Sequence, residues 1–341
     1  MTLKPYLVDV PLKFNIWIRP ECQKQQMREI CKARPSKLFI VSDGGRNETE
    51  WEAIQANRKL VDSSIDWDCE IVRLYADHNQ GLYHTEMQAY ETIFSQVDRC
   101  CFLEDDTIPS VSWFRFCADL LEKYKDDQRI NMICGMNHLG NYTRPSSDYF
   151  FSRMGSVWGC ASWKRVYDQY YDFSYGKDPY IMDLLQHETA KHPSFQKKIN
   201  AYAENEYYQG HKAFEEFFTE FGLYAQHQLF IVSSRNLVTN IGATADSAHF
   251  TEMNQVPKKL RGLFNMKRYE LNFPLKDPKY VIPDYYYEKK VHEIMADEGA
   301  WNKTERFLEY KYLYLKNGGS LSDGIKKVIK RRMHQNQELE K

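Results

Sequence analysis

Three consecutive acidic residues follow one of the most apolar stretches of the chain. Residues 100–103 have the composition of a buried β-strand, and Glu104, Asp105 and Asp106 come directly after them. Residues two apart on an extended chain share a face, so Glu104 and Asp106 point together and Asp105 points away. Neighbouring carboxylates repel one another unless a cation offsets their charge. The run therefore predicts a site for a hard divalent ion such as Mg²⁺ or Mn²⁺, with an acidic turn or helix cap as the alternative.

Polar side chains also follow the other predicted strands. Arg19 could hold a phosphate, and Asp43 lies in a turn with two glycines and Arg46, where a carboxylate could accept a hydrogen bond from a base or ribose. The segment 77–82 leads into a helix, whose first amides and dipole suit a phosphate. Each feature is also compatible with an ordinary turn. Because ligands of parallel sheets bind beyond the carboxyl ends of the strands, we expect these groups at one shared site.

An alternation of strands and helices over the first 160 residues must position these groups. Strands are predicted at 14–18, 37–41, 70–74, 100–103 and 131–134, and helices at 21–33, 51–61, 87–94 and 113–124. Such alternation implies βαβ units and a mostly parallel sheet covered by helices. The second half is less regular, with a helical stretch predicted at 183–221 and a late strand at 228–232. From residue 257 onward, prolines and aromatic residues predict an extension that wraps the domain surface.

Composition narrows the class of protein. The 341 residues carry 46 Lys and Arg against 47 Asp and Glu, and this balance argues against a dedicated nucleic-acid binder. Aromatic residues reach 15%, and such rings line sugar and nucleotide sites as well as filling cores. Eight cysteines without a CxxC pair predict reduced core thiols rather than a zinc cluster. Without a signal-peptide pattern or an apolar run of about 20 residues, we expect a cytoplasmic protein.

Several segments, in order along residues 14–283, resemble bacterial nucleotide-sugar glycosyltransferases of the GT-A fold (GT2-like). The segments that carry the resemblance are Asn79-Gln80-Gly81-Leu82, 103–110, Gly135-Met136-Asn137, 149–153, 158–165, 236–242 with His249, and Phe273-Pro274-Leu275-Lys276. The resemblance implies an α/β GT-A domain at 1–250, with a mixed, mostly parallel sheet flanked by helices. It places a nucleotide-binding half at 1–135 and an acceptor-binding half at 136–250, followed by a C-terminal extension at 251–341.

The resemblance also implies a metal-dependent reaction. A sugar would move from a nucleoside-diphosphate sugar, with UDP favoured, to a hydroxyl of a glycan or lipid-linked saccharide in bacterial polysaccharide biosynthesis. Glu104, Asp105 and Asp106 would form the DxD-type element: Asp106 would bind Mn²⁺ or Mg²⁺, and Glu104 or Asp105 the ribose. His249 would touch the metal or the diphosphate. The further donor contacts implied are Arg19, Asp43, Arg46, Asn79 and Gly81, and the acceptor contacts are Asn137, Trp158, Gly159 and Trp163.

An inverting single displacement also needs a carboxylate that deprotonates the acceptor hydroxyl. Glu216 and Glu215 are the candidates, because their position matches the acidic segment of the family. Neighbours in a helix point about 100° apart, so we expect only one of the two to face the site. Asp168 and Asp172 are reserve candidates.

Two other functions remain open. A sugar-phosphate nucleotidyltransferase would carry a Gly-rich loop with Arg and Lys after the first strand, where this chain has Arg19-Pro20-Glu21. A catalytically degenerate carbohydrate- or nucleotide-binding scaffold would lack metal-dependent nucleotide binding. The tail at 325–333 has five cations among apolar residues that share one helical face. It could contact the anionic inner face of a cell membrane, or form a solvated helix.

Overall fold

The computed structural model describes residues 3–170, 174–204, 215–242, 253–296 and 299–317. The chain divides into two compact units, the larger made of 1–242 and 263–291 and the smaller of 243–262 and 292–341. Residues 263–291, which the sequence assigned to the extension, therefore belong to the larger unit. They join it through a parallel bridge between Phe151 and Pro283 and another between Asn240 and Phe264.

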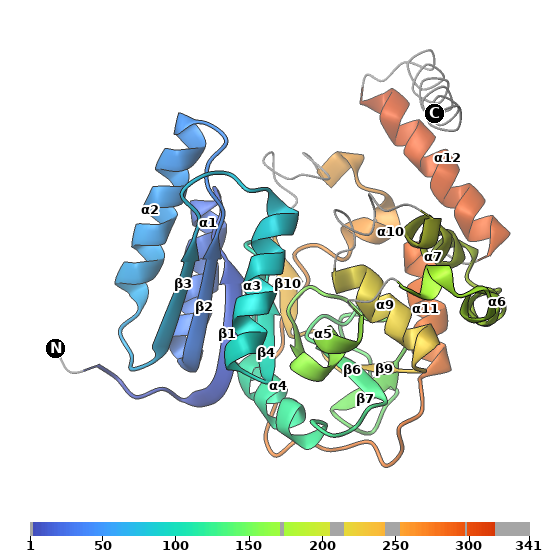
Figure 1. Cartoon of the computed structure of the whole chain (residues 1–341), viewed down its shortest axis with the longest axis horizontal. Coiled ribbons are helices and arrows are strands. Elements are labelled where there is room, and N and C mark those ends of the chain that lie inside the picture. The colour runs from blue at the N-terminus through green and yellow to red at the C-terminus, as the bar shows by residue number, and fades with distance from the viewer. Residues whose placement is uncertain (1–2, 171–173, 205–214, 243–252, 297–298, 318–341) are drawn as a thin grey trace. The chain divides into compact units, whose positions relative to one another are not determined.

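The larger unit is built on an eight-stranded sheet in the order β3-β2-β1-β4-β8-β6-β9-β7 (Figure 1). Its strands are β1 (Val8–Asn15), β2 (Pro35–Ser42), β3 (Glu70–Tyr75), β4 (Arg99–Leu103), β6 (Ile130–Cys134), β7 (Tyr149–Ser152), β8 (Cys160–Trp163) and β9 (Leu229–Ser233). β8 and β7 run antiparallel to their neighbours, and the other six strands share one direction. The prediction of an α/β fold with a mixed, mostly parallel sheet is confirmed.

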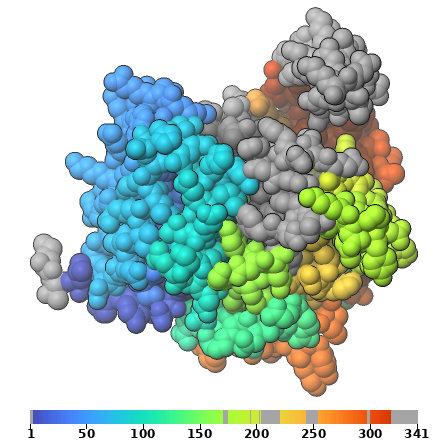
Figure 2. Space-filling view, in the orientation of Figure 1, coloured from blue at the N-terminus to red at the C-terminus, as the bar shows by residue number. Residues whose placement is uncertain are grey.

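Helices cover both faces of this sheet because its strands are apolar on both sides. The helices between the first strands are α1 (Pro20–Ala33), α2 (Glu48–Ser64), α3 (Leu82–Gln96) and α4 (Val111–Lys123). Successive strand side chains point to opposite faces. Leu38 and Ile40 accordingly pack in one core with α1 and α4, whereas Phe39 and Val41 pack in a second core with α3. α3 lies in front of part of the sheet in Figure 1, and the space-filling view shows the surface of the same face (Figure 2).

The first strand begins six residues earlier, and ends three residues earlier, than the sequence predicted. β1 begins at Val8 and ends at Asn15, whereas the apolar residues around Ile16 and Trp17 predicted a strand at 14–18. The reason is Lys13, which is 3% exposed and forms a 2.5 Å ion pair with Glu86 of α3. A lysine inside a strand looks like a solvent-exposed residue in the sequence, and only the buried partner on α3 makes it a core residue.

Shorter elements complete the larger unit. β5 (Thr107–Pro109) and β10 (Val238–Asn240) form an antiparallel ribbon beside the main sheet. The stretch predicted as one helical region is divided into α6 (Pro179–Glu188), α7 (Pro193–Glu204) and α9 (Glu215–Ala225), after α5 (Lys164–Tyr170) and the 3-10 helix η1 (Ser174–Lys177). α7 starts at a proline, which suits a first helical turn but not a helix interior. α11 (Tyr285–Met295) begins in this unit and buries Tyr287 and Val291.

The described part of the smaller unit contains η2 (Met253–Gln255), α10 (Lys258–Arg261) and α12 (Ala300–Lys316). The Lys258 amide donates to Glu309, and Lys259 forms a 2.8 Å ion pair with Glu305, so α10 is tied to α12. The predicted basic tail at 325–333 lies outside the described residues. In the described ranges, no helix combines the length and the apolar character needed to cross a membrane. All eight cysteines are unpaired, and six are buried.

Candidate functional site

Three neighbouring parallel strands end beside the predicted site residues. β2, β1 and β4 are adjacent in the sheet, and their carboxyl ends are followed by Asp43, Arg19 and the run Glu104 to Asp106. The residue pairing of β1 with both neighbours brings these ends to one edge. The sequence-based expectation that these groups share one edge of the sheet is met.

Arg19 lies against two of the three acidic side chains. Its Nη1 donates a 2.8 Å hydrogen bond to Oδ2 of Asp106, and its Nε lies 3.7 Å from Oδ2 of Asp105. The side chains of Arg19, Asp105 and Asp106 are 12%, 18% and 15% exposed. The Arg19 backbone is fixed as the cap residue before α1, and Pro20 occupies the first helical turn. A largely buried guanidinium therefore compensates the charge of Asp105 and Asp106.

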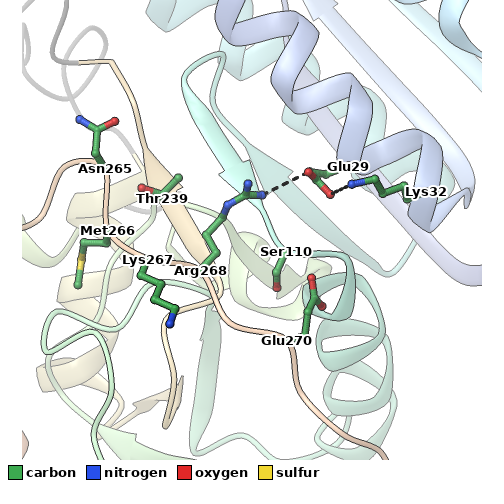
Figure 3. A pocket seen from close by; sticks show the side chains of 9 residues that line it. All are labelled: Glu29, Lys32, Ser110, Thr239, Asn265, Met266, Lys267, Arg268 and Glu270. Atoms are coloured by element: carbon green, nitrogen blue, oxygen red, sulfur yellow. Dashed lines mark hydrogen bonds and ion pairs between the residues drawn. The ribbon is translucent and has the colours of Figure 1, made fainter.

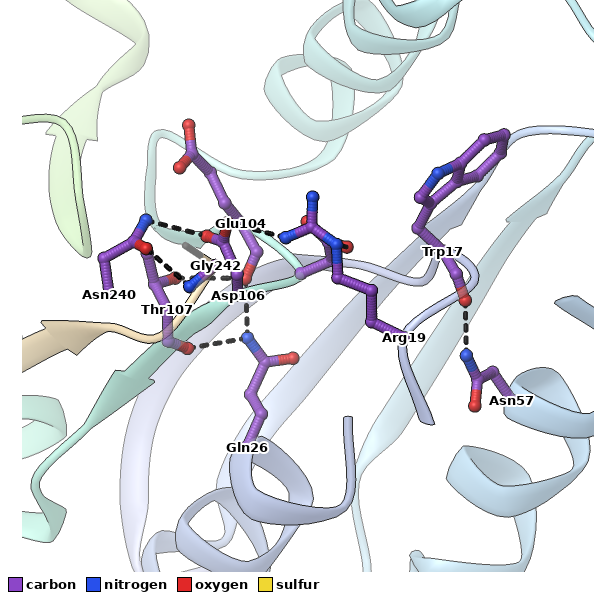
Figure 4. A network of polar contacts seen from close by, with 10 residues as sticks. Trp17, Arg19, Gln26, Asn57, Glu104, Asp106, Thr107, Asn240 and Gly242 are labelled. Carbon is purple, nitrogen blue, oxygen red and sulfur yellow. Dashed lines mark hydrogen bonds and ion pairs between the residues drawn. The ribbon is translucent and has the colours of Figure 1, made fainter. Parts of the chain in front are cut away.

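The end of β10 closes the other side of Asp106 (Figure 4). Asn240 donates a 2.9 Å hydrogen bond from Nδ2 to Oδ1 of Asp106, and its own Oδ1 accepts a 2.8 Å bond from the Gly242 amide. The Ile241 amide donates to the backbone carbonyl of Asp106 at 3.0 Å. A Cβ atom at position 242 would lie 1.8 Å from Oδ2 of Asp106, so only glycine fits there without rearrangement.

Gln26 of α1 binds the backbone of the acidic turn. Its side chain is fully buried, and its Nε2 donates to the carbonyls of Glu104 and Thr107 at 2.7 and 2.9 Å (Figure 4). Glu104 lies in the tight connection between β4 and β5 and Thr107 begins β5, so Gln26 links the two ends of the acidic turn. Gln26 was not predicted as a site residue, because a glutamine among helical polar residues is typical of a solvated face. Asn240 and Gly242 did stand in a segment that carries the family resemblance.

Burial changes the protonation of this cluster. Burial raises the pKa of Asp105 to about 6, although Arg19 opposes the shift; the negative charge of Asp106 adds to it. Burial lowers the pKa of Arg19, but the Asp105 and Asp106 carboxylates outweigh that effect and hold the pKa above its usual value. The guanidinium thus stays charged, and Asp105 takes up a proton as the pH falls through about 6.

The cluster has the donor chemistry that attracts a cation. Its carboxylate oxygens are hard ligands, and the Oδ2 atom of Asp105 is buried without a hydrogen-bond partner. Within the described ranges, no three His, Cys, Asp or Glu side chains are arranged to hold a metal ion together. His249, the second predicted ligand, lies outside those ranges. The described carboxylates fit a cation at this position, and Arg19 is the cation that they contact.

Asp43 organises the loops at the ends of β2 and β3. Its Oδ1 accepts hydrogen bonds from the amides of Gly44 and Gln80 at 2.8 Å, and its Oδ2 accepts from Asn79 Nδ2 and the Gly81 amide at 3.0 Å. Both carboxylate oxygens, which the sequence assigned to a base or ribose, therefore have donors within the protein. Asn79 also donates to the Gly44 carbonyl, so four of these hydrogen bonds join the two loops.

Two further residues that the sequence predicted to contact the nucleotide sugar, Gly81 and Arg46, lie at the rim of these two loops. Gly81 has φ +81° and precedes α3, and no atom lies within 4 Å of a Cβ built on it, so the space before the helix is open. Arg46 is exposed and forms an ion pair with Glu50, and its guanidinium lies 5.8 Å from the centre of the Trp17 ring. Trp17 itself follows β1, so an aromatic ring and a guanidinium flank this edge of the sheet.

The predicted acceptor contacts fall into two groups. Gly159 and Trp158 precede β8 at its end nearest the acidic run, because Cys160 pairs with Phe102 in the antiparallel register. Trp158 packs its ring 5.3 Å from that of Phe264. Gly159 has φ +64°, and a Cβ there would lie 2.5 Å from Val238, so the position requires glycine.

Trp163 lies at the opposite edge of the sheet, whereas Asn137 follows β6 at the same edge as Gly159 and Trp158. Trp163 pairs with Arg99 at the opposite end of β4, is 3% exposed and donates from Nε1 to the Leu121 carbonyl. β8 runs antiparallel to β4, so its first residue lies beside the end of β4 and its last residue, Trp163, beside the start. Asn137 is fully buried, and its side chain bonds the Ser233 carbonyl. Its Oδ1 also accepts from the amide of Leu139. Both side chains are committed to the fold in this structure.

The candidate bases are described only in part. Glu215 and Glu216 are the first two residues of α9, and their side chains lie outside the described structure. Asp172 also lies outside it. Asp168, on α5, forms a 2.8 Å ion pair with Lys164.

A cavity of about 470 Å³ has a different set of lining residues (Figure 3). Its lining consists of Glu29, Lys32, Ser110, Thr239, Asn265, Met266, Lys267, Arg268 and Glu270. Arg268 lies 3.8 Å from Glu29 and donates to the Pro109 carbonyl, and Glu270 accepts from the first amides of α4. None of the predicted site residues lines this cavity, so the acidic cluster remains the candidate functional site.

Comparison with known proteins gives fold neighbours at low similarity. No protein-family model matches the chain, and neither does any curated protein sequence. One structural neighbour is a mannosyltransferase from Pyrobaculum calidifontis in complex with GDP-Man and Mn²⁺, with 9% identity and a TM-score of 0.34 over 50% of this chain and 48% of that one. Mouse xyloside xylosyltransferase 1 in its apo form has 13% identity and a TM-score of 0.34 over 65% and 84%. The inositol-1-phosphate CTP transferase from T. maritima has 9% identity and a TM-score of 0.38 over 76% and 96%.

Proposed function

We propose that this chain is a glycosyltransferase that binds a nucleoside-diphosphate sugar at the carboxyl edge of β2, β1 and β4. The observation that carries the proposal is the buried cluster of Arg19, Asp105 and Asp106 at that edge. A cation and paired carboxylates beside the ends of parallel strands suit a ligand that carries both phosphate and sugar hydroxyl groups. Asn240 and Gly242 support it further, because they hold Asp106 in one orientation.

The loop pair organised by Asp43 would receive the nucleotide. Arg46 and the Trp17 ring offer a positive group and an aromatic face at the rim. The open space beside Gly81 lies before α3, whose first turn carries no acidic residue. The positive end of a helix dipole favours a phosphate there. In this arrangement Asp43 shapes the loops that surround the nucleotide, and Asn79 and Gly81 complete them.

The reaction would be an inverting displacement. The acceptor hydroxyl oxygen forms a bond to the anomeric carbon of the donor while the bond from that carbon to the diphosphate oxygen breaks. Glu216 or Glu215 takes the hydroxyl proton, and the diphosphate leaves with the electron pair. A divalent ion bound by Asp106, with His249 as a second ligand, would offset the charge that develops on the diphosphate. Trp158 and Gly159 would contact the acceptor from the start of β8.

A glycan or lipid-linked saccharide is the proposed acceptor, and a UDP-sugar is the proposed donor. We place the reaction in the bacterial cytoplasm during polysaccharide biosynthesis. The basic segment 325–333 would bring the chain to the inner face of the membrane, where lipid-linked acceptors are found.

Donor binding tests this function most directly. UDP-, GDP-, dTDP- and CMP-sugars are titrated into the full chain with Mn²⁺ and with EDTA, and donor hydrolysis is followed in the same samples. We expect one donor to bind in Mn²⁺ and the Asp106→Ala variant to lose that binding. Asp62→Ala is the matched control, because Asp62 pairs with Arg73 at the surface. A folded protein that binds none of these donors would favour a scaffold role instead.

A further inference from the structure

Both carboxylate oxygens of Asp106 already have partners inside the protein. Oδ2 accepts from Arg19 at 2.8 Å, and Oδ1 accepts from Asn240 at 2.9 Å. Each carboxylate oxygen has a second lone pair, so these bonds alone do not close the residue to a ligand. The surroundings of the two oxygens therefore decide whether another cation can approach.

Gly242 blocks further approach to Oδ2 on one side. The position that a Cβ would take at residue 242 is 1.8 Å from Oδ2 of Asp106 and 2.9 Å from Nη1 of Arg19. The backbone at Gly242 thus lies against the hydrogen bond between the two side chains. With Arg19 on one side and this backbone on another, a second cation meets a crowded Oδ2.

The positive charge of Arg19 also opposes the binding of a metal ion at Asp106. A metal ion beside Asp106 would lie within a few ångströms of the Arg19 guanidinium, and two cations repel strongly at a site where the side chains are more than four-fifths buried. The Arg19 backbone is anchored, since its carbonyl accepts from the Gln23 amide and Pro20 follows it. The side chain alone is free to rotate away by changing its χ angles.

We propose that Arg19 occupies the cation position of the acidic cluster and that a divalent ion binds Asp106 only in exchange for the Arg19 guanidinium. The inference rests on the proposed function, because it concerns the metal that this function uses. A released guanidinium has the planar set of donors that binds a phosphate, so the exchange would present Arg19 to the diphosphate of the donor. Metal binding and donor binding would then support each other.

Mn²⁺ affinity without any nucleotide tests the exchange. The Mn²⁺ dissociation constant of the full chain is measured from the electron paramagnetic resonance signal of free Mn²⁺, for wild type, Arg19→Gln and Arg73→Gln. We expect Arg19→Gln to bind Mn²⁺ at least tenfold more tightly than wild type. Arg73→Gln removes the same charge from a surface pair with Asp62 and should stay within twofold of wild type. In the double variant Arg19→Gln/Asp106→Asn the gain should disappear.

A second variant and a second readout guard against misfolding. Arg19→Lys keeps a positive charge, but an ammonium group cannot contact both carboxylates as the planar guanidinium does. Its Mn²⁺ affinity should therefore fall between those of wild type and Arg19→Gln. In EDTA, Arg19→Gln should melt below wild type, and Mn²⁺ should raise its melting temperature more than that of wild type.

Equal or weaker Mn²⁺ binding by the folded Arg19 variants overturns the exchange, and so does a gain that survives Asp106→Asn. The donor titration is a separate experiment. If no donor binds but the Arg19→Gln gain appears, the proposed function fails and the exchange stands. If a donor binds and the Arg19→Gln gain is missing, the proposed function stands and the exchange fails.

Discussion

Asn240 donates its side-chain amide to Asp106 at 2.9 Å across 134 residues of sequence. The bond is possible because β10 pairs with β5 in antiparallel register, with Asn240 opposite Thr107. The Asn240 carbonyl oxygen in turn accepts from Gly242, so one side chain orients both the carboxylate and the backbone beside it. The orientation of Asp106 is thus set by a strand from the far half of the chain.

Substitutions of Asn240 should therefore destabilise the protein in a defined order. Asn240→Ala leaves a partly buried carboxylate oxygen without its donor, at a cost of ~1–3 kcal/mol in the free energy of unfolding. Asn240→Asp should cost more, because it adds a negative charge beside Asp106. Urea unfolding of both variants at pH 7 measures the order. An aspartate variant as stable as wild type would contradict the contact.

Gly242→Ala should displace Asp106 or Arg19. The added Cβ would lie 1.8 Å from Oδ2 of Asp106, and overpacking of this kind costs ~1–3 kcal/mol. Gly262→Ala is the matched control, because its nearest neighbour would be 3.7 Å away. We expect the urea midpoint to fall for Gly242→Ala and to stay near wild type for Gly262→Ala. Equal midpoints for the two variants would show that the 242 backbone is not packed against the carboxylate.

Asp105 should make stability depend on pH between about 4 and 6. Its folded pKa of about 6 lies above the ordinary value of 3.8, so the folded state holds a proton that the unfolded state has released. The contribution of Asp105 to stability is therefore complete below pH 4 and is lost as the pH rises through 6. Asp105→Asn removes this loss, which amounts to up to about 3 kcal/mol.

The measurement is urea unfolding of wild type and Asp105→Asn in EDTA at pH 4, 5, 6 and 7. The stability of the variant relative to wild type should rise from pH 4 to 6 and change little above that. A constant difference across the range would mean that Asp105 titrates normally.

Asp43→Ala should loosen the loops that follow β2 and β3. Four hydrogen-bond donors lose their acceptor in this variant. Because water can replace part of these contacts, we expect the free energy of unfolding to fall by ~1–3 kcal/mol. Amide hydrogen exchange at Gln80 and Gly81 should accelerate, because both amides bond Asp43. Asp77→Ala is the control. In the described structure, the exposed carboxylate of Asp77 has the neighbouring His78 ring as its side-chain partner. Unchanged exchange in Asp43→Ala would contradict the loop role.

The repeating part of the fold was predictable from residue types alone. Strands at 37–41, 70–74, 100–103 and 131–134 lie within β2, β3, β4 and β6, because apolar runs between helical stretches are typical of strands buried on both faces. The shared edge of Asp43, Arg19 and Asp106 followed from that alternation. β1 was displaced because the pairing of Lys13 with Glu86 is a tertiary contact that no local pattern reveals.

The remaining features depend on strand direction and on distant partners. β8 runs antiparallel to β4, which places Trp163 at the end of β4 remote from the acidic run, and a segment of six residues does not reveal that direction. The hydrogen bonds from the loop after β3 to Asp43 were not predicted, because a carboxylate beside glycines suits both a ligand contact and a loop contact. Gln26 was not selected because its partners are backbone carbonyls 78 and 81 residues away.

The strand order has a consequence for the folding of a nascent chain. β8 lies between β4 and β6, and β10 supplies Asn240 to Asp106. A nascent chain of residues 1–135 therefore contains β1 to β4 and β6 but lacks β8, the strand that joins β4 to β6. Contacts of such high contact order form late, because a long loop must close before they contribute. An isolated fragment 1–135 would expose the edge of β4 and leave Asp106 without its β10 partner. The acidic cluster therefore reaches its final geometry only after residue 242 has been synthesised.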